Sequence, residues 1–373
     1  MGIDRASWVW ETLLHLSSVN LMRINSGDLT NFCRQLLQAA GVDDAQAETL
    51  TDNLVWCDMA GRRNHGVQRL PILLRHVEAK TIKCPSAPRL ELLGETLAHL
   101  DADQSFGHHA GRLAIDQACD LAAAHGVGIV GVTNSSFFGA GAYYANRAAE
   151  RGMISLVLSN SFPKVAAPGG LRALLGTNPF TFGAPRRAKR ALLVDMSTAS
   201  VAGSTVREKA EKGELFPDGI AIDDVGNPIH DPNQVLKGTL LPAAGPKGFG
   251  IALMVEVLSA ALTGAAMSRQ VGSMYKNFDR PGANGHFMMA LDVTRWMPVE
   301  DFFDRMDLLA QFADASGSDN AVRMPGDARW VAYQDSLKNG IVLEPATMTS
   351  IADLAQSHGL TVPWESSSQQ DDK

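Results

Sequence analysis

The stretch Asn64-His65-Gly66-Val67-Gln68-Arg69-Leu70-Pro71 places an imidazole and a guanidinium four residues apart, just after a predicted helix that ends near Gly61. An imidazole can hand a proton to a developing alkoxide near neutral pH. A guanidinium can donate two parallel hydrogen bonds to a carboxylate. His65 and Arg69 are therefore the pair of side chains that the reduction of a 2-oxo acid needs.

Two helices are predicted before this stretch. Ser26 or Asp28 can cap the first, whose apolar residues at helical spacing are Leu29, Phe32, Leu36 and Leu37. Asp44 opens the second, which Gly61 closes.

After the stretch, short apolar runs alternate with helical segments. The runs at 128–132, 154–158 and 192–195 have the composition of buried strands, and a helix at about 142–151 separates the first two in a βαβ-like rhythm. Residues 207–245 are rich in Gly, Pro and Asp, so we expect a long excursion outside the core. The other predicted elements are a strand at 287–293 and helices at about 108–124, 249–263, 300–316 and 349–358. Together these patterns predict an α/β protein.

Composition narrows the class of protein. A chain of 373 residues is long enough for two subdomains, because a single core stops growing at roughly 250–300 residues. The net charge of -7 argues against a nucleic-acid partner, and the basic run at 186–190 is too short to make a binding surface. No apolar run reaches the roughly 18 residues of a membrane-spanning helix, so we expect no membrane partner.

Cysteine usage and the two ends of the chain complete this picture. The four cysteines lie far apart without a CxxC pair, and no His, Cys and Asp cluster has metal-ligand spacing. We therefore expect free thiols, no metal and a cytoplasmic location. Residues 1–23 are expected to form an N-terminal extension rather than a targeting peptide, and residues 363–373 a disordered polar tail.

Gly139-Ala140-Gly141 is a candidate for a dinucleotide-binding turn, because it follows an apolar run and leads into a helix. The next predicted strand ends Leu158-Ser159-Asn160-Ser161, without the acidic residue that would bind a ribose. Tyr143 and Tyr144 also occupy the start of the helix. We favour the alternative, in which these small residues let the helix pack closely on a sheet.

From residue 24 to about 362 the chain resembles the type-2 malate/L-lactate dehydrogenase family, which includes ureidoglycolate and sulfolactate dehydrogenases, 2,3-diketo-gulonate reductase and a cyclic-imine carboxylate reductase. The resemblance rests on six segments in the same order: Asn64–Pro71, Ala167-Pro168-Gly169-Gly170, Leu175-Gly176-Thr177-Asn178-Pro179, Val194-Asp195-Met196-Ser197-Thr198, Leu241-Pro242 with Pro246-Lys247-Gly248, and Met324-Pro325-Gly326-Asp327.

The resemblance implies a non-Rossmann α/β fold with a mixed central sheet and flanking helices, which binds NAD or NADP and forms a homodimer. Residues 24–125 plus 298–362 would form a mainly helical domain that carries the catalytic loop, and residues 126–297 would bind the cofactor. The implied activity is hydride transfer between the nicotinamide and C2 of a 2-hydroxy/2-oxo acid, or of a cyclic imino acid.

The resemblance also assigns roles to single residues. His65 would exchange the proton, and Asp195 would hold His65 near the nicotinamide. The carboxylate of the substrate would bind to Arg69, with Asn64 and Thr177 beside it. The implied cofactor contacts are Ser161, Leu193, Val194, Asp195, Met196, Ser197, Pro246, Lys247, Gly326, Asp327 and Ala328.

One position departs from the family pattern in a way that bears on chemistry. Phe137 stands where relatives commonly carry a histidine, and a phenyl ring cannot transfer a proton. His65 would then act alone, or the pocket would suit a more apolar substrate. A further possibility is a relative that binds NAD(P) without catalysing turnover.

Overall fold

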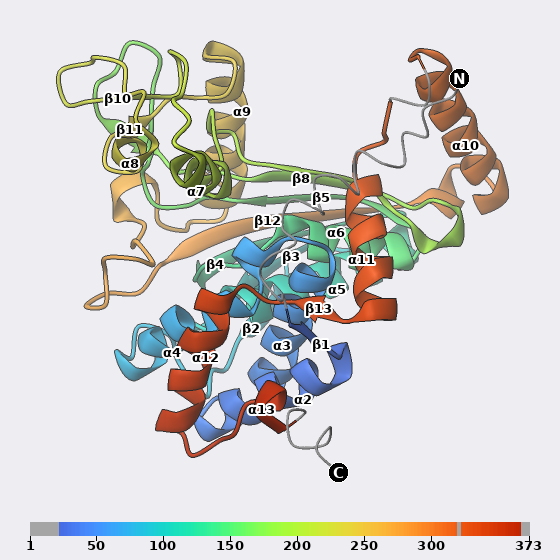
Figure 1. The fold of residues 1–373 in the computed structure, drawn as a ribbon. Helices are drawn as coiled ribbons and strands as arrows, with labels where there is room; N and C mark the ends of the chain where they lie inside the picture. The colour runs from blue at the N-terminus through green and yellow to red at the C-terminus, as the bar shows by residue number, and fades with distance from the viewer. Residues whose placement is uncertain (1–21, 319–321, 367–373) are drawn as a thin grey trace, which may run out of the picture.

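A seven-stranded mixed sheet organises the computed structural model, which describes residues 22–318 and 322–366 (Figure 1). Neighbouring strands are antiparallel, except that β3 and β4 are parallel. The strands, in spatial order, are β2 (Arg89–Leu92), β3 (Leu97–Asp101), β4 (Val127–Ser135), β12 (Asn284–Asp292), β5 (Met153–Ser159), β8 (Phe180–Ala184) and β9 (Leu192–Met196). The predicted α/β class and mixed sheet are confirmed.

Strand β12 lies between β4 and β5, the two strands that the predicted βαβ pattern joins. It is antiparallel to both, and Met288 pairs with Val130 of β4 on one side and Val157 of β5 on the other. Helix α6 (Gly141–Glu150) joins β4 to β5 along the chain, as predicted. The two strands run in the same direction without being hydrogen-bonded to each other, because β12 occupies the position between them.

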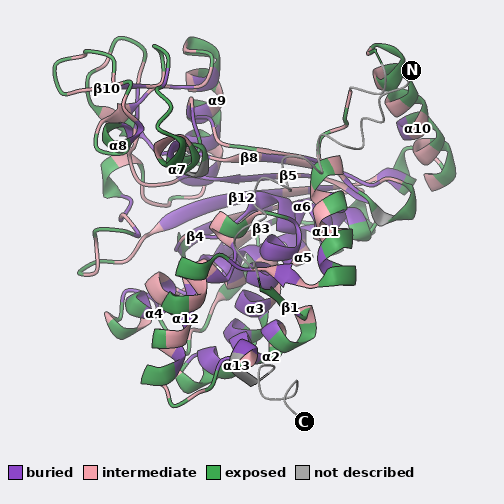
Figure 2. Ribbon diagram, in the orientation of Figure 1, coloured by how far each residue is buried: buried purple, intermediate pink, exposed green. Residues whose placement is uncertain are grey.

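Helices α5 (Gly107–His125) and α6 cover one face of this sheet. The side chains at the interface are small: Ala110, Ala114 and Ala118 of α5 are fully buried. Small side chains allow the helix backbone to come close to the strands, and the central core cluster fills the space between the two layers (Figure 2).

A second core lies in a helical unit built from both ends of the described chain. Its helices are α2 (Ser26–Ala39), α3 (Asp44–Met59), α4 (Leu70–Glu78), α12 (Pro345–Ser357) and α13 (Pro363–Ser366). Strand β1 (Arg23–Ile24) pairs with β13 (Ile341–Val342), which ties the two ends together. The N-caps are Asn25 and Asp43. Asn25 precedes both predicted candidates, Ser26 and Asp28, and Asp43 is one residue before the predicted start at Asp44.

The two ends differ in how far they can be compared with the predictions. The expected extension at residues 1–23 lies almost entirely outside the described residues, as does the tail after residue 366. At the start of that tail, Trp364 of α13 is buried, and its ring lies 5.9 Å from the ring of Phe32. Residues 363–366 are therefore helical rather than disordered.

The excursion at 207–245 contributes no residue to the two larger cores, as expected, and it shares a small core with residues before it. Two of its strands join β6 (Val165–Ala166) and β7 (Ala173–Leu175) in a four-stranded sheet of order β10-β11-β6-β7. The elements of the excursion are α7 (Gly203–Lys212), β10 (Ala221–Ile222), α8 (Pro232–Val235) and β11 (Thr239–Leu240). Helix α9 (Pro246–Glu256) follows and continues into a π-helical turn at Val257–Ala261.

Two helices complete the described chain. Helix α10 (Val299–Ala315) projects from the end of the sheet, and Met306 is its one buried residue (Figure 1). Helix α11 (Asp327–Asn339) was not predicted from the sequence. Among the described helices, none has both the length and the apolar character that crossing a membrane requires.

Candidate functional site

The loop that carries His65 and Arg69 consists of two short 3-10 turns, η1 (Arg63–His65) and η2 (Val67–Arg69), between α3 and α4. Asp58 of α3 fixes this loop, because it accepts a hydrogen bond of 2.8 Å from the backbone N–H of Val67. Gly66 sits directly on the same carboxyl group: a Cβ atom there would lie 1.9 Å from Asp58 Oδ1. Burial raises the pKa of Asp58 to about 7.

His65 projects from this loop against an aromatic ring. Its imidazole stacks on Phe137, with 5.8 Å between the ring centroids and 11° between the ring planes. The Nδ1 atom is buried and has no hydrogen-bond partner among the described residues. Burial, and secondly the charge of Arg69, lower the pKa of His65 to about 4. An unpartnered buried nitrogen is costly unless a ligand supplies its partner.

Arg69 lies beside His65 and keeps its charge unpaired within the described part of the chain. Its Nε donates to the backbone oxygen of Asn64 at 2.7 Å, and its Nη1 donates to Tyr275 Oη at 3.0 Å. The guanidinium carbon lies 5.8 Å from the centroid of Phe137 and 5.7 Å from that of Tyr275. These contacts orient the guanidinium without neutralising it, which suits the binding of a carboxylate.

Asp195 of β9 is held by groups other than His65. Its Oδ1 accepts from Thr181 Oγ1 at 2.9 Å, and its Oδ2 accepts from Arg329 Nη2 at 2.9 Å. Arg62 Nη2 lies 3.8 Å from the same Oδ2 atom. No hydrogen bond joins Asp195 to His65 in the described structure, so the expectation that Asp195 holds His65 directly is not met.

Arg62 and Arg329 are site residues that the sequence did not reveal. Each has one buried nitrogen without a partner among the described residues, namely Arg62 Nε and Arg329 Nη1. Burial and the neighbouring charge of Arg329 lower the pKa of Arg62. A carboxylate at the end of an apolar strand requires a cation, but nothing in the sequence indicates which of the 33 Lys and Arg residues supplies it.

The predicted cofactor contacts Ser161 and Ser197 lie next to Thr177, which was predicted to lie beside the substrate carboxylate. Ser161 Oγ and Thr177 Oγ1 are 3.4 Å apart, and Ser197 Oγ donates to the backbone oxygen of Thr177 at 3.2 Å. The backbone N–H of Ala243, shortly before α9, donates to Thr198 O at 2.9 Å. This bond brings the segment leading to Pro246 and Lys247 alongside the segment after β9.

Pro246 and Lys247 occupy the first turn of α9 and are exposed. No side chain caps this helix N-terminus. The N–H groups of Gly248 and Phe249 donate to Ala243 O and Gly245 O. The positive end of the helix dipole and the ammonium of Lys247 together suit a phosphate group.

The predicted contacts on and next to β9 are not all accessible. Leu193 is buried in the core, whereas Val194 is half-buried and Met196 is exposed. Leu193 N–H donates to Pro325 O at 3.0 Å, which places Gly326, Asp327 and Ala328 next to this strand. Ala328 is exposed, and Asp327 accepts a hydrogen bond of 2.9 Å from Arg186 Nη1.

A buried carboxylate supports Ser161 from the opposite side. The backbone N–H of Ser161 donates to Asn178 Oδ1 at 3.2 Å, and Asn178 Nδ2 donates to Glu256 Oε2 at 2.8 Å. Asn178 and Glu256 are both buried. Glu256 lies in the helix predicted at 249–263, and no local pattern marks it as a site residue, because its partner is 78 residues away along the chain.

The close-packing interpretation of Gly139-Ala140-Gly141 is confirmed. A Cβ atom on Gly141 would lie 2.0 Å from Thr181 Oγ1, the hydroxyl that binds Asp195. The side chain of Thr181 therefore fills the space that a pyrophosphate would need, and the Rossmann alternative is wrong.

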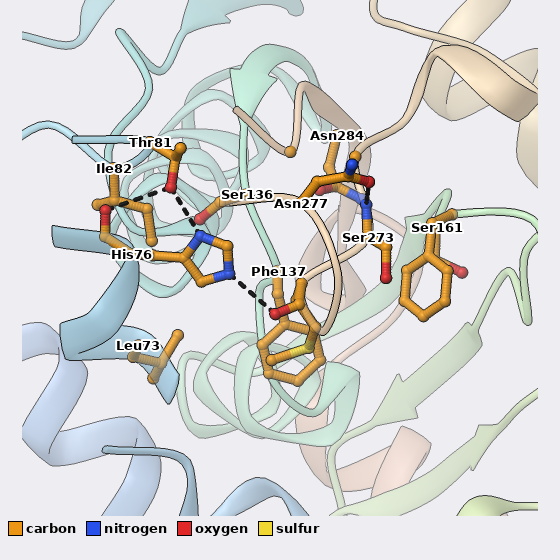
Figure 3. Close-up of a pocket in the computed structure, with 14 residues that line it drawn as sticks. Leu73, His76, Thr81, Ile82, Ser136, Phe137, Ser161, Ser273, Asn277 and Asn284 are labelled. Carbon is orange, nitrogen blue, oxygen red and sulfur yellow. Dashed lines mark hydrogen bonds between the residues drawn. The ribbon is translucent and has the colours of Figure 1, made fainter. Parts of the chain in front are cut away.

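A cavity of about 50 Å³ opens on the side of Phe137, between α4, the start of β12 and the loop before β12 (Figure 3). Its lining residues are Leu73, His76, Thr81, Ile82, Ser136, Phe137, Ser161, Phe162, Gly272, Ser273, Met274, Asn277, Gly282 and Asn284. Phe137 connects this cavity to His65 and Arg69, and Ser161 connects it to the predicted cofactor contacts. Among the described residues, no group of three or more His, Cys, Asp or Glu could hold a metal ion.

Comparison with known proteins identifies relatives along most of the chain. Residues 24–352 match the family model described as malate/L-lactate dehydrogenase. The chain is 33% identical over 355 residues to malate dehydrogenase of Pyrococcus abyssi, covering 91% of this chain and 96% of that protein. It is 31% identical over 333 residues to malate/(S)-sulfolactate dehydrogenase of Methanothermus fervidus, covering 88% and 96%.

Solved structures agree with this assignment. The structure of malate dehydrogenase from Pyrococcus horikoshii OT3 superposes with a TM-score of 0.82 at 28% identity, covering 92% of this chain and 97% of that chain. Other relatives carry NAD(+) or NADP(+) in their names, and one is a reductase of pyrroline- and piperideine-2-carboxylates.

Proposed function

The chain belongs to the malate/L-lactate dehydrogenase family, and we propose that His65 and Arg69 carry its chemistry. It is an NAD(P)-dependent oxidoreductase that transfers a hydride between the nicotinamide and C2 of a 2-hydroxy/2-oxo acid or of a cyclic imino acid. One observation carries the assignment of residues. A buried, unpartnered imidazole nitrogen and an unpaired guanidinium project from one loop that Asp58 holds in place.

Arg69 binds the carboxylate of the substrate, and His65 exchanges a proton with the oxygen on C2. In reduction, C2 gains the hydride and its oxygen gains the proton of His65, so that a 2-hydroxy acid results. A carboxylate on Arg69 offsets one of the charges that keep the pKa of His65 low. Substrate binding therefore makes His65 a better proton carrier at the moment when it is needed.

The residues present suit a dinucleotide. The buried N–H groups of Arg62 and Arg329 lack partners within the described chain, and Lys247 lies at an uncapped helix N-terminus. Both features favour phosphate or amide oxygens of NAD or NADP. The bound nicotinamide supplies the hydride. Asp195 binds Arg329 and lies beside Arg62, so its charge would partly balance theirs where the cofactor binds.

We also propose a homodimer in the cytoplasm. Support for the dimer comes from α10, which exposes Leu308, Leu309 and Phe312 to solvent. Large exposed apolar surfaces mark contacts between proteins. Support for the compartment comes from the cysteines, all four of which are free.

Replacing His65 tests the assignment. His65→Ala should lower kcat by about 10²–10⁴-fold, because general acid–base catalysis contributes about that much. The affinity for NADH and NADPH, measured by fluorescence titration, should stay within about threefold of wild type, because the coenzyme contacts lie elsewhere. His125→Ala, at the exposed end of α5, is the matched control and should leave kcat unchanged.

The same assays distinguish the proposed oxidoreductase from a relative that binds NAD(P) without catalysing turnover. They would use 2-oxo acids and cyclic imino acids as substrates. A wild-type protein that binds NAD(P)H but turns over none of them would favour that alternative. A wild-type kcat in His65→Ala would remove His65 from the mechanism.

A further inference from the structure

The cavity beside Phe137 has no charge to offer a substrate. Among the described residues that line it, none is Asp, Glu, Lys or Arg. Arg75 follows Leu74 on α4, but its guanidinium lies over the ring of Phe278, 3.8 Å from the centroid, and it does not line the cavity. A second carboxylate or a sulfonate placed there would be buried without a counter-charge, which is costly.

The one titratable side chain in the lining, His76, is already satisfied. Its Nε2 lies 2.9 Å from the backbone oxygen of Met274, so Nε2 must carry a proton and donate it. Its Nδ1 is hydrogen-bonded to Thr81 Oγ1 at 2.7 Å. Both ring nitrogens are thereby bonded within the protein, with no N–H left to bind an anion (Figure 3).

Three other polar side chains of the lining are bonded within the protein. Ser136 Oγ accepts from Gly107 N–H at 2.8 Å and donates to Ser105 O at 3.2 Å. Asn277 Oδ1 accepts from Ser273 N–H, and Asn284 Nδ2 donates to Asn160 O. Uncharged hydroxyl and amide groups and the apolar surface of Leu73, Ile82, Phe137, Phe162 and Met274 are what remains for a ligand.

The cavity lies where the substituent on C2 would extend. Phe137 contacts His65 and Arg69 and also lines the cavity. On the other side, Tyr275 bonds Arg69, and its ring lies 5.9 Å from that of Phe162 in the cavity wall. A continuous aromatic wall therefore leads from the carboxylate-binding guanidinium into the cavity.

The volume limits what can enter. One water needs roughly 10–15 Å³ of such space, and an engineered cavity of about 150 Å³ holds benzene. The 50 Å³ found here is a third of that volume, so the cavity suits a short aliphatic chain better than a phenyl ring.

We propose that this cavity receives the side chain of the substrate, and that the substrate is a 2-oxo monocarboxylate with a short branched aliphatic side chain. The proposal rests on the proposed function, because it takes Arg69 as the carboxylate site and His65 as the proton donor. It distinguishes this protein from its malate- and sulfolactate-oxidising relatives, whose substrates carry a second anionic group.

A series of substrates on the wild-type enzyme tests the proposal. The measured quantity is kcat/KM for NADH- or NADPH-dependent reduction of pyruvate, 2-oxobutanoate, 3-methyl-2-oxobutanoate, 4-methyl-2-oxopentanoate, phenylpyruvate, oxaloacetate and sulfopyruvate. Each buried methylene group should raise kcat/KM about fourfold, so 4-methyl-2-oxopentanoate should exceed pyruvate by about 50-fold. Phenylpyruvate and the two dianions should be poorer substrates than 4-methyl-2-oxopentanoate.

A charge introduced into the wall should reverse the preference. Met274→Lys places an ammonium in the cavity, so kcat/KM should fall at least tenfold for 4-methyl-2-oxopentanoate and rise at least tenfold for oxaloacetate. Val225→Lys makes the same change of charge at a position that is 69% exposed, and should alter neither value more than about twofold. If Met274→Lys does not fold, the wild-type series decides alone.

The outcomes separate this proposal from the one on which it rests. Higher kcat/KM for oxaloacetate or sulfopyruvate than for the aliphatic acids overturns the substrate class and leaves the oxidoreductase intact. An unchanged preference in folded Met274→Lys also overturns it. No turnover with any 2-oxo acid or cyclic imino acid overturns the assignment of His65 and Arg69 instead.

Discussion

At the scale of single residues, the contact between His65 and Phe137 decides how the proton carrier behaves. The phenyl ring excludes water from one face of the imidazole and offers it no hydrogen bond. The ring of His65 is therefore neutral at neutral pH in the free protein. A histidine with one nitrogen bonded to a carboxylate would instead remain protonated to higher pH.

This environment predicts an unusual pH profile for the oxidation of the 2-hydroxy acid. Neutral His65 must accept the proton, and its pKa in the free enzyme is about 4. The value of kcat/KM should therefore be level from about pH 5 to pH 8 and fall on the acid side near pH 4. The fall of kcat on the acid side should occur at a higher pH than the fall of kcat/KM, because the bound carboxylate offsets the charge of Arg69.

Steady-state rates between pH 4 and 9, with the enzyme returned to pH 7 after each exposure to acid, check this profile. In reduction the protonated form is needed, so kcat/KM should rise steadily as the pH falls from 7 toward 4. An acid limb near pH 6.5 in kcat/KM for oxidation, the ordinary value for histidine, would contradict the assigned environment.

Much of the residue-level site could be predicted because it is local in sequence. His65 and Arg69 lie on one loop, and the structure brings them together as the spacing predicted. Arg62, Arg329 and Glu256 could not be assigned, because each acts on a partner many residues away along the chain. These three charged residues can be recognised only from their burial and their distant partners in the structure, and not from a local sequence pattern.

At the scale of elements, α3 and the loop after it act as one rigid support. The carboxyl group of Asp58 contacts both Gly66 and Val67, and it thereby fixes the loop that carries His65 and Arg69. Gly66 has φ of -87° and ψ of -157°, which other residues can adopt. The requirement for glycine at this position is therefore steric, and it comes from the missing Cβ atom.

Gly66→Ala should displace this loop. The new methyl group would meet Asp58 Oδ1, and overpacking of this kind costs about 1–3 kcal/mol of unfolding free energy. A shift of about 1 Å in catalytic groups can cost about 100-fold in rate, so kcat/KM should fall by that order. Urea denaturation and steady-state kinetics measure the two effects.

Gly94→Ala is the matched control for this variant. A Cβ atom on Gly94, in the turn between β2 and β3, would meet no atom within 4 Å. Its unfolding free energy should stay within about 0.5 kcal/mol of wild type. Wild-type stability and rate in Gly66→Ala would show that Asp58 does not fix the loop.

The predictability of the elements follows their periodicity only in part. The positions of α2, α3, α5, α6 and α12 were predicted from apolar residues at helical spacing. Helix α11 was missed, because only Trp330 and Ser336 in it are buried. Helix α4 was also missed, although its apolar residues recur at helical spacing. The order of the strands could not be predicted at all, since pairing between distant segments leaves no local pattern.

At the scale of the whole molecule, α10 and the apolar residues near it form a surface that the single chain leaves uncovered. Phe312 is 63% exposed and Trp296 is 78% exposed. The ion pairs of Arg187 with Glu300, Asp304 and Asp307 hold the polar side of α10. The apolar side is therefore free to pack against a second copy.

The oligomeric state tests this surface. Light scattering coupled to size exclusion should give the mass of a dimer for the wild type and a shift toward the monomer for Phe312→Asp, because a charge would be buried at the interface. Leu215 is about as exposed as Phe312 and does not belong to α10, so the Leu215→Asp variant is the control and should remain dimeric. A monomeric wild type, or a dimeric Phe312→Asp, would exclude α10 from the interface.

The central position of β12 has a consequence for the synthesis of the chain. Of the seven strands in the main sheet, β12 is the last to be translated, yet it pairs with β4 and β5, which precede it by more than a hundred residues. Until residue 292 has left the ribosome, both of those strands present an unpaired edge, which is the kind of surface that recruits strands from other chains. A nascent chain of this protein that stops short of β12 should therefore require protection by chaperones, however completely its helices have formed.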